Sequence, residues 1–191
     1  MNILTIDFDW IMGDIIETYN GEISSNEDYD KMWNGILLHS PGVNYWPNFK
    51  LYQEIKDICD IYKGRLYKIT NHHDIVRYIE NLNEPVETLL NIDHHHDYYK
   101  DSGLHYNCGN WVRWLYKNKK FKDYIWIPND TSQLHLSDEN DIHLLTVPPY
   151  PREAIFRYKI DQVFLCQSPE WLSPQANELW NLWTATLDFN N

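Results

Sequence analysis

Basic residues are scarce in this 191-residue chain, with 16 Lys and Arg against 28 Asp and Glu, a formal net charge of −12. Nucleic acids and anionic membrane surfaces attract proteins through Lys and Arg, so this balance argues against both kinds of partner. The sequence has no apolar run long enough to span a bilayer. Its first residues also lack the basic and apolar segments of a signal peptide, so we expect a cytoplasmic protein.

Cysteine is equally scarce, with three residues and no CxxC spacing, which argues against a disulfide framework. The chain also lacks internal repeats, low-complexity tracts and Gly/Ser-rich linkers, so we expect a single domain over residues 1–191. Apolar residues, in contrast, make up 43% of the sequence, enough for a hydrophobic core. A disordered or fibrous chain is thereby excluded.

Short apolar runs alternate with amphipathic stretches along the chain. Runs bounded by polar or turn residues are typical of buried strands, and they cover residues 3–6, 65–70, 87–92, 124–127, 142–147 and 162–166. Apolar spacing predicts helices over 48–63, 74–82 and 109–118, with another that begins after Ser173. This alternation indicates an α/β fold with a mainly parallel sheet, in which ligands bind at the carboxyl ends of the strands.

Six of the nine histidines lie within residues 72–105. One predicted strand continues directly into Asp-His-His-His-Asp at residues 93–97. In an extended segment alternate side chains share a face, so Asp93, His95 and Asp97 should point the same way. This mixed set of oxygen and nitrogen donors predicts a divalent metal site, whereas the alternative is a solvated polar loop.

Two further predicted strands lead into residue types that bind metals. The strand at 65–70 is followed by His72 and His73, and the opening strand by Asp7 and Asp9. Alternatively, His72 and His73 could cap a helix or pack in the core. One of the two aspartates could instead cap the turn that follows the strand. Because both pairs follow strands, we expect them to lie at the same edge of the sheet as the third motif.

An apolar strand followed by Asp-x-Asp also resembles the nucleophile motif of haloacid-dehalogenase-type phosphatases. In that alternative Asp7 would be the nucleophile and Mg²⁺ the ion. The phosphatase motif usually continues with Thr or Val two residues after its second Asp, where this chain has Ile11. The later basic and paired acidic motifs of that family are not evident either.

As a set, Asp-x-Asp, a histidine and Asp-x-His-x-Asp resemble the metal site of the superfamily of arginases, agmatinases and histone deacetylases. A closer resemblance is to a small arginase-like family, matched at residues 71–74 and 91–97. Members of that family resemble the peptide arginases of ribosomal natural-product (RiPP) biosynthesis. The family's late Asp-x-Asp strand retains only Asp161 here, and Asp7 and Asp9 supply the pair from the opposite end of the chain.

The resemblance implies a three-layer arginase/deacetylase-like fold, reduced in size and with a rearranged strand order. It also implies a binuclear centre with two Mn²⁺ ions per chain, whose ligands would be Asp7, Asp9, His72, Asp93, His95 and Asp97. In this assignment Asp7 and Asp93 bridge the two ions. His72 and Asp97 then bind mainly one ion, and His95 and Asp9 bind the other.

The activity implied by the resemblance is hydrolysis of arginine guanidinium groups within a precursor peptide, giving ornithine and urea. Asp97 would pass a proton to the leaving amine. His105 would shuttle protons, because residues 102–105 (Ser-Gly-Leu-His) resemble, with shorter spacing, the Ser-Gly-x-x-His loop of arginases. Glu170 is a candidate to bind the guanidinium, with a helix-entry acid as the alternative. His73 and His96 are further candidates for substrate contact, with packing or solvent exposure as the alternative.

The sequence is also compatible with three other functions. One is the phosphatase already described, the second is a deacetylase with the arginase-like fold, and the third is a non-catalytic, metal-stabilised module that binds a peptide. Asn107, Asn110 and Trp111 follow His105 closely and are further candidates for contact with any of these substrates.

Overall fold

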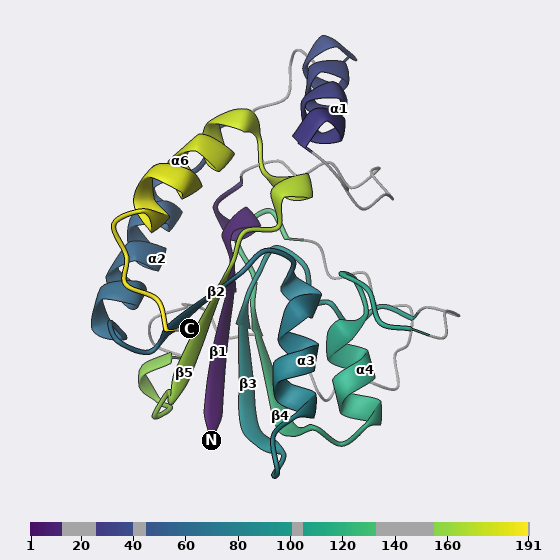
Figure 1. The fold of residues 1–191 in the computed structure, drawn as a ribbon, viewed down its shortest axis with the longest axis vertical. Coiled ribbons are helices and arrows are strands. Elements are labelled where there is room, and N and C mark those ends of the chain that lie inside the picture. The colour runs from purple at the N-terminus through teal and green to yellow at the C-terminus, as the bar shows by residue number, and fades with distance from the viewer. Residues whose placement is uncertain (13–25, 40–44, 101–104, 133–154, 191) are drawn as a thin grey trace.

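The computed structural model describes residues 1–12, 26–39, 45–100, 105–132 and 155–190. One five-stranded sheet has the order β2-β5-β1-β3-β4, and every neighbouring pair is parallel (Figure 1). The strands are β1 (Asn2–Asp7), β2 (Leu66–Ile69), β3 (Val86–Ile92), β4 (Phe121–Ile127) and β5 (Gln162–Cys166). Five predicted strands and the parallel α/β class are therefore confirmed, while the strand expected at 142–147 lies outside the described residues.

Four of the described helices match the expected ones, namely α2 (Phe49–Ile61), α3 (Ile75–Glu80), α4 (Trp111–Lys117) and α6 (Pro174–Thr184). Three short 3-10 helices follow strands: η1 (Phe8–Ile11), η2 (His72–Asp74) and η4 (Pro169–Trp171). Local signals set the ends of these elements. The Ser173 hydroxyl accepts a hydrogen bond from the Ala176 N–H at the start of α6, and Gly64 adopts a φ of +87° in the turn after α2.

Helix α1 (Asn26–His39) has no counterpart among the predicted helices. Its buried or half-buried residues Tyr29, Met32, Trp33 and Ile36 recur at three- and four-residue spacing and pack against the core. This stripe is the signal that could have revealed the helix. Within the parts of the chain that the structure describes, no helix combines the length and apolar character needed to cross a membrane.

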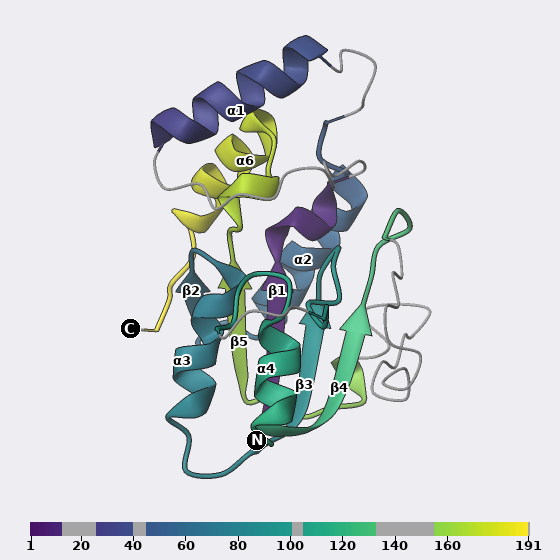
Figure 2. The same cartoon turned by 90° about the vertical axis from the view of Figure 1, so that its right-hand side faces the viewer.

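The helices form a layer on each face of the sheet. Leu4 and Ile6 of β1 belong to one core cluster with residues of α2 and α6. Ile3 on the same strand belongs to a second cluster with residues of α3 and α4. Because successive strand residues point to opposite faces, these two clusters define three layers, helix, sheet and helix (Figures 1 and 2).

The chain leaves the two neighbouring strands β1 and β3 toward opposite faces. The next helix after β1 to pack on the sheet is α2, whereas β3 leads to α4 on the other face (Figure 1). In an open parallel sheet, such a reversal leaves a crevice outside the carboxyl ends of the two strands. This position is where the candidate ligands meet.

Candidate metal centre

Three strand ends supply the ionisable residues at this edge of the sheet. Asp7 is the last residue of β1, Asp93 directly follows β3, and His72 begins η2 after β2. Asp9 lies in η1, and His95 lies in the bend after Asp93. All of these residues except His95 are buried. Buried ionisable side chains are rare in proteins, and here four of them lie together at one end of the sheet.

The inner group consists of Asp7, His72 and Asp93, whose ligand atoms lie within 4.8 Å of one another. Nδ1 of His72 is 3.1 Å from Oδ2 of Asp7 and 3.0 Å from Oδ2 of Asp93. Oδ2 of Asp97 is also near, at 3.2 Å from the same nitrogen. Three carboxylates therefore converge on one imidazole nitrogen.

The outer group consists of Asp9, Asp93 and His95, again with ligand atoms within 4.8 Å of one another. Nδ1 of His95 lies 3.4 Å from Oδ2 of Asp9. Asp93 belongs to both groups, whereas Asp7, the other predicted bridging ligand, belongs to the inner group alone. A carboxylate shared in this way is the arrangement that a bridging metal ligand requires.

The polar atoms of the two groups are arranged to bind divalent ions rather than to form hydrogen bonds with one another. Both Nδ1 of His72 and Oδ2 of Asp9 are buried without a hydrogen-bond partner. An ion about 2.1 Å from each ligand holds neighbouring ligand atoms roughly 3 Å apart, close to the spacings around His72. A carboxylate-rich set with imidazole suits a metal such as Mn²⁺. We conclude that the inner and outer groups form a candidate metal centre.

The pKa shifts of the buried groups also indicate that this cluster of carboxylates lacks a compensating positive charge. Burial and the neighbouring Asp97 raise the pKa of Asp93 to about 7. Burial and repulsion from Asp7 raise the pKa of Asp9 well above its usual range. Burial lowers the pKa of His72, but its contacts with the surrounding carboxylates outweigh burial and raise that pKa well above its ordinary value. A bound cation would relieve all three shifts.

Buried hydroxyl groups hold two members of the inner group. The Ser168 hydroxyl, just beyond β5, donates a 2.6 Å hydrogen bond to Oδ2 of Asp7. Oγ1 of Thr5 lies 2.5 Å from Nε2 of His72. When Nε2–H donates to Thr5, the lone pair of Nδ1 faces the carboxylates, which is the orientation that a metal-binding histidine needs.

Nitrogen donors hold the other carboxylates. Nδ2 of Asn91 donates to Oδ2 of Asp93 at 3.1 Å, and the Trp111 indole N–H donates to Oδ2 of Asp97. The Trp111 ring also packs against His72, with centroids 4.8 Å apart. Trp111 therefore contacts two candidate ligands, Asp97 and His72. The sequence suggests only that Trp111 contacts a substrate.

The sequence holds a signal for two of these supporting residues. Thr5 and Asn91 are polar residues near the carboxyl ends of two predicted strands, and each lies two positions before a ligand, Asp7 or Asp93. Residues two apart in a strand share a face, so a polar residue at this position can reach the site. No comparable pattern marks Ser168, which only the strand order brings beside β1.

The backbone at the site departs from the expected extended segment. Residues 93–95 form a bend after β3, residues 96–97 have no regular structure, and Asp97 has a φ of +51°. Asp93, His95 and Asp97 still converge, but through this bent path rather than through strand alternation. Ser168 also has a left-handed φ of +45°. Such conformations are costly for residues other than glycine and persist where surrounding contacts enforce them.

The other histidines of the 93–97 segment have different surroundings. His96 is buried, its Nδ1 accepts a hydrogen bond from the N–H of Tyr98, and its ring packs 4.1 Å from that of Tyr99. His94 is buried too, and burial together with the neighbouring His95 lowers the pKa of His94 to about 4. Neither His94 nor His96 belongs to the inner or outer group.

The remaining candidates lie outside the two groups as well. His73 is half-buried, with its ring 6.1 Å from Tyr106, and His105 is exposed. Residues 101–104, the rest of the loop expected to resemble that of arginases, are outside the described residues. Asp161 accepts a hydrogen bond from the N–H of Asn2 at the amino end of the sheet, opposite the candidate ligands.

Glu170 is buried in η4. Its neighbour Trp171 places its ring 5.2 Å from that of His95, so η4 borders the outer group. The hydroxyl of Tyr29 in α1 donates a 2.9 Å hydrogen bond to the carbonyl of Leu172. Helix α1 is thereby connected to the segment that borders the metal centre.

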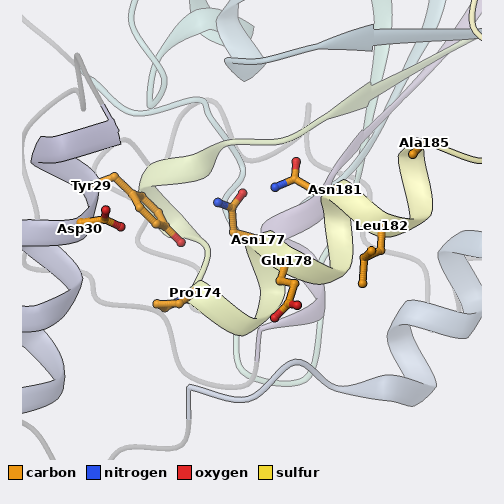
Figure 3. A pocket seen from close by; sticks show the side chains of 8 residues that line it. All are labelled: Tyr29, Asp30, Pro174, Asn177, Glu178, Asn181, Leu182 and Ala185. Carbon is orange, nitrogen blue, oxygen red and sulfur yellow. The ribbon is translucent and has the colours of Figure 1, made fainter.

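A surface cleft with a volume of about 440 Å³ opens between α1 and α6 (Figure 3). Its lining includes the acids Asp30 and Glu178, the amides Asn177 and Asn181, and the exposed apolar side chain of Leu182. Tyr29, which also lines the cleft, is the residue that contacts Leu172. The cleft therefore begins beside the segment that contains Trp171.

Comparisons of the chain with protein-family models, with curated proteins and with solved structures found no match.

Proposed function

We propose that this protein is a binuclear manganese hydrolase that converts arginine residues of a peptide to ornithine, with release of urea. The observation on which the proposal chiefly depends is the position of Asp93, which is shared by the inner and outer groups. The resemblance of the three strand-end motifs to those of arginases supplies the choice of reaction. The proposed set of ligands is Asp7, Asp9, His72, Asp93, His95 and Asp97.

Two divalent ions held by these ligands would lower the pKa of a shared water so that hydroxide is available near neutral pH. The overall reaction adds water to the guanidinium carbon and breaks its bond to the side-chain nitrogen. Asp97 is the proposed proton donor to that leaving nitrogen, because the Trp111 indole fixes the position of its Oδ2. His105, which is exposed, is the proposed carrier of protons to solvent.

The substrate side of the proposal depends on charge. Glu170 is the proposed partner of the guanidinium, since a carboxylate can accept two parallel hydrogen bonds from it. The formal net charge of −12 favours a cationic substrate at long range. The cleft between α1 and α6, with Asp30 and Glu178 in its lining, is the proposed seat of the peptide that flanks the arginine. His73 and His96 stay secondary candidates for substrate contact.

The phosphatase alternative has less support. Both oxygens of Asp7 accept hydrogen bonds, Oδ2 from Ser168 and Oδ1 from the N–H of Asp9, and Oδ2 also lies 3.1 Å from Nδ1 of His72. Asp7 is also only 3% exposed. Asp7 shares the nitrogen of His72 with the carboxylates of Asp93 and Asp97, a position that suits a metal ligand better than a group that must approach an anionic phosphate. The deacetylase alternative would use the same metal centre, so only a test of substrates separates it.

The test is to incubate the purified full chain and Mn²⁺ with synthetic arginine-containing peptides and to follow peptide mass. We expect a loss of one cyanamide unit per converted arginine, with release of one urea, and no reaction for Asp93→Asn. Acetyl-lysine peptides and p-nitrophenyl phosphate are run in parallel. Release of acetate or phosphate with unchanged arginine peptides would refute the proposal, and stabilisation by Mn²⁺ with no turnover at all would favour a binding module.

A further inference from the structure

The inner and outer groups differ in how much of their geometry exists before an ion binds. In the inner group, Asp7 is held by Ser168 at 2.6 Å and His72 by Thr5 at 2.5 Å. Ser168 and Thr5 are themselves buried, at 3% and 0% exposure. Water therefore does not compete for these contacts, and the two ligands need little reorganisation when an ion binds.

Asp9 and His95, the two ligands that belong to the outer group alone, have no equivalent side-chain hydrogen bond among the described residues. Oδ2 of Asp9 accepts no hydrogen bond, and its Oδ1 accepts only a long one of 3.4 Å from the N–H of His94. The His95 side chain is 19% exposed, against 2% for His72. Asp9 and His95 must therefore lose more freedom than the inner ligands when an ion binds.

Charge favours the inner position as well. Oxygens of three carboxylates, Asp7, Asp93 and Asp97, lie within 3.2 Å of Nδ1 of His72. The outer group offers two carboxylates, Asp9 and the shared Asp93. In a buried site the attraction for a divalent cation grows with each added negative charge.

From these three differences we infer that the two metal positions are unequal. The inner position binds its Mn²⁺ first and tightly, and the outer position binds weakly and exchanges its ion with solvent. Ser168 and Thr5 are positioning residues of the tight position, because they orient Asp7 and His72 without touching the ion. The inference rests on the metal centre of the proposed function and is independent of its substrate.

Titration of the metal-free full chain with Mn²⁺ tests this, with unbound Mn²⁺ followed by electron paramagnetic resonance and heat by calorimetry. We expect two binding steps whose dissociation constants differ by at least about tenfold. Loss of a hydrogen bond that orients a ligand typically weakens metal affinity by about 10- to 100-fold. Thr5→Val and Ser168→Ala should therefore weaken the first step, whereas Thr5→Ser, which keeps the hydroxyl, should preserve it.

His95→Ala should remove the second step and leave the first. Thr186→Val serves as a matched control, because it also removes a hydroxyl but lies beyond the end of α6, where Oγ1 donates to the carbonyl of Trp183. Two equal binding steps in the wild-type chain, or loss of the first step in His95→Ala, would overturn the inference. So would a first step that Thr5→Val and Thr186→Val affect equally.

The outcomes also separate this inference from the proposed function. Two unequal steps in a protein that leaves every arginine peptide unchanged would refute the arginase activity and uphold the inference. Urea release by a protein that binds two ions with equal affinity would do the reverse. A chain that binds no Mn²⁺ would refute both.

Discussion

Nδ1 of His72 lies 3.0 Å from Oδ2 of Asp93, although the strands that these residues follow, β2 and β3, are separated in the sheet by β5 and β1. Both residues reach the carboxyl end of β1, where Asp7 approaches the same nitrogen at 3.1 Å. This convergence of residues from three strands turns separate polar motifs into one candidate metal centre.

Removal of the shared carboxylate should affect both metal positions. Asp93→Asn keeps the shape of the side chain but loses the negative charge that both groups use. We expect two Mn²⁺ per chain in the wild type, measured by elemental analysis at equilibrium with a dialysis buffer that contains Mn²⁺, and fewer than one in the variant. The rise in melting temperature on adding Mn²⁺ should also disappear. A variant that retains two ions and full turnover would rule out the bridging role of Asp93.

The stability of the metal-free protein should fall as pH rises. The pKa of Asp93 is about 7 in the fold against a usual 3.8, so its neutral form is favoured by folding. The contribution is fully present below pH 3.8 and lost as pH rises through about 7. The raised pKa values of Asp9 and His72 act in the same direction. The lowered pKa of His94, about 4 against 6.5, acts in the opposite direction below pH 6.5, but it is one group against three.

Thermal unfolding in a chelator at pH 5.5 and at pH 8 measures this dependence. We expect a lower melting temperature at pH 8, and we expect Mn²⁺ to restore stability most at the higher pH, where protons no longer compete for the carboxylates. A metal-free protein that is more stable at pH 8 than at pH 5.5 would contradict the assigned pKa shifts.

Trp111→Phe should impair the site while preserving the fold. The change removes the indole N–H that donates to Asp97 but retains an aromatic ring to pack against His72. We expect turnover of arginine peptides, measured as urea release, to fall by about 10- to 100-fold. Trp114→Phe on the same helix is the matched control, since its indole N–H donates to Glu80 instead. Equal losses in both variants would indicate a structural role for Trp111.

The cleft between α1 and α6 can be tested through its charge. Combining Asp30→Asn with Glu178→Gln should raise the KM for an arginine peptide that also contains lysine, by about twofold to tenfold, because exposed ion pairs are weak. The value of kcat should stay unchanged, since neither residue belongs to the metal centre. The control combines Glu84→Gln with Asp123→Asn, two other exposed acids. An unchanged KM in the cleft variant would exclude this surface as the seat of the peptide.

Much of the fold was predictable because its signals are local. Five strands appear where apolar runs predict them, and Ser173 begins α6 through a hydrogen bond to a residue three positions away. Helix α1 was missed although Tyr29, Met32, Trp33 and Ile36 form a regular stripe. The apolar face of α1 packs on residues that are remote in the sequence. The contacts that stabilise this helix are therefore visible only in the tertiary structure.

The sequence by itself determined which residue types follow each strand, and hence that carboxylates and histidines collect at one end of a parallel sheet. Only the tertiary structure decided that His72 rather than His73 faces the carboxylates, and that Ser168 and Thr5 hold the inner ligands. The reason is that strand order is a non-local property. The placement of β1 between β3 and β5 brings Asp7 beside Asp93 on one side and Ser168 on the other.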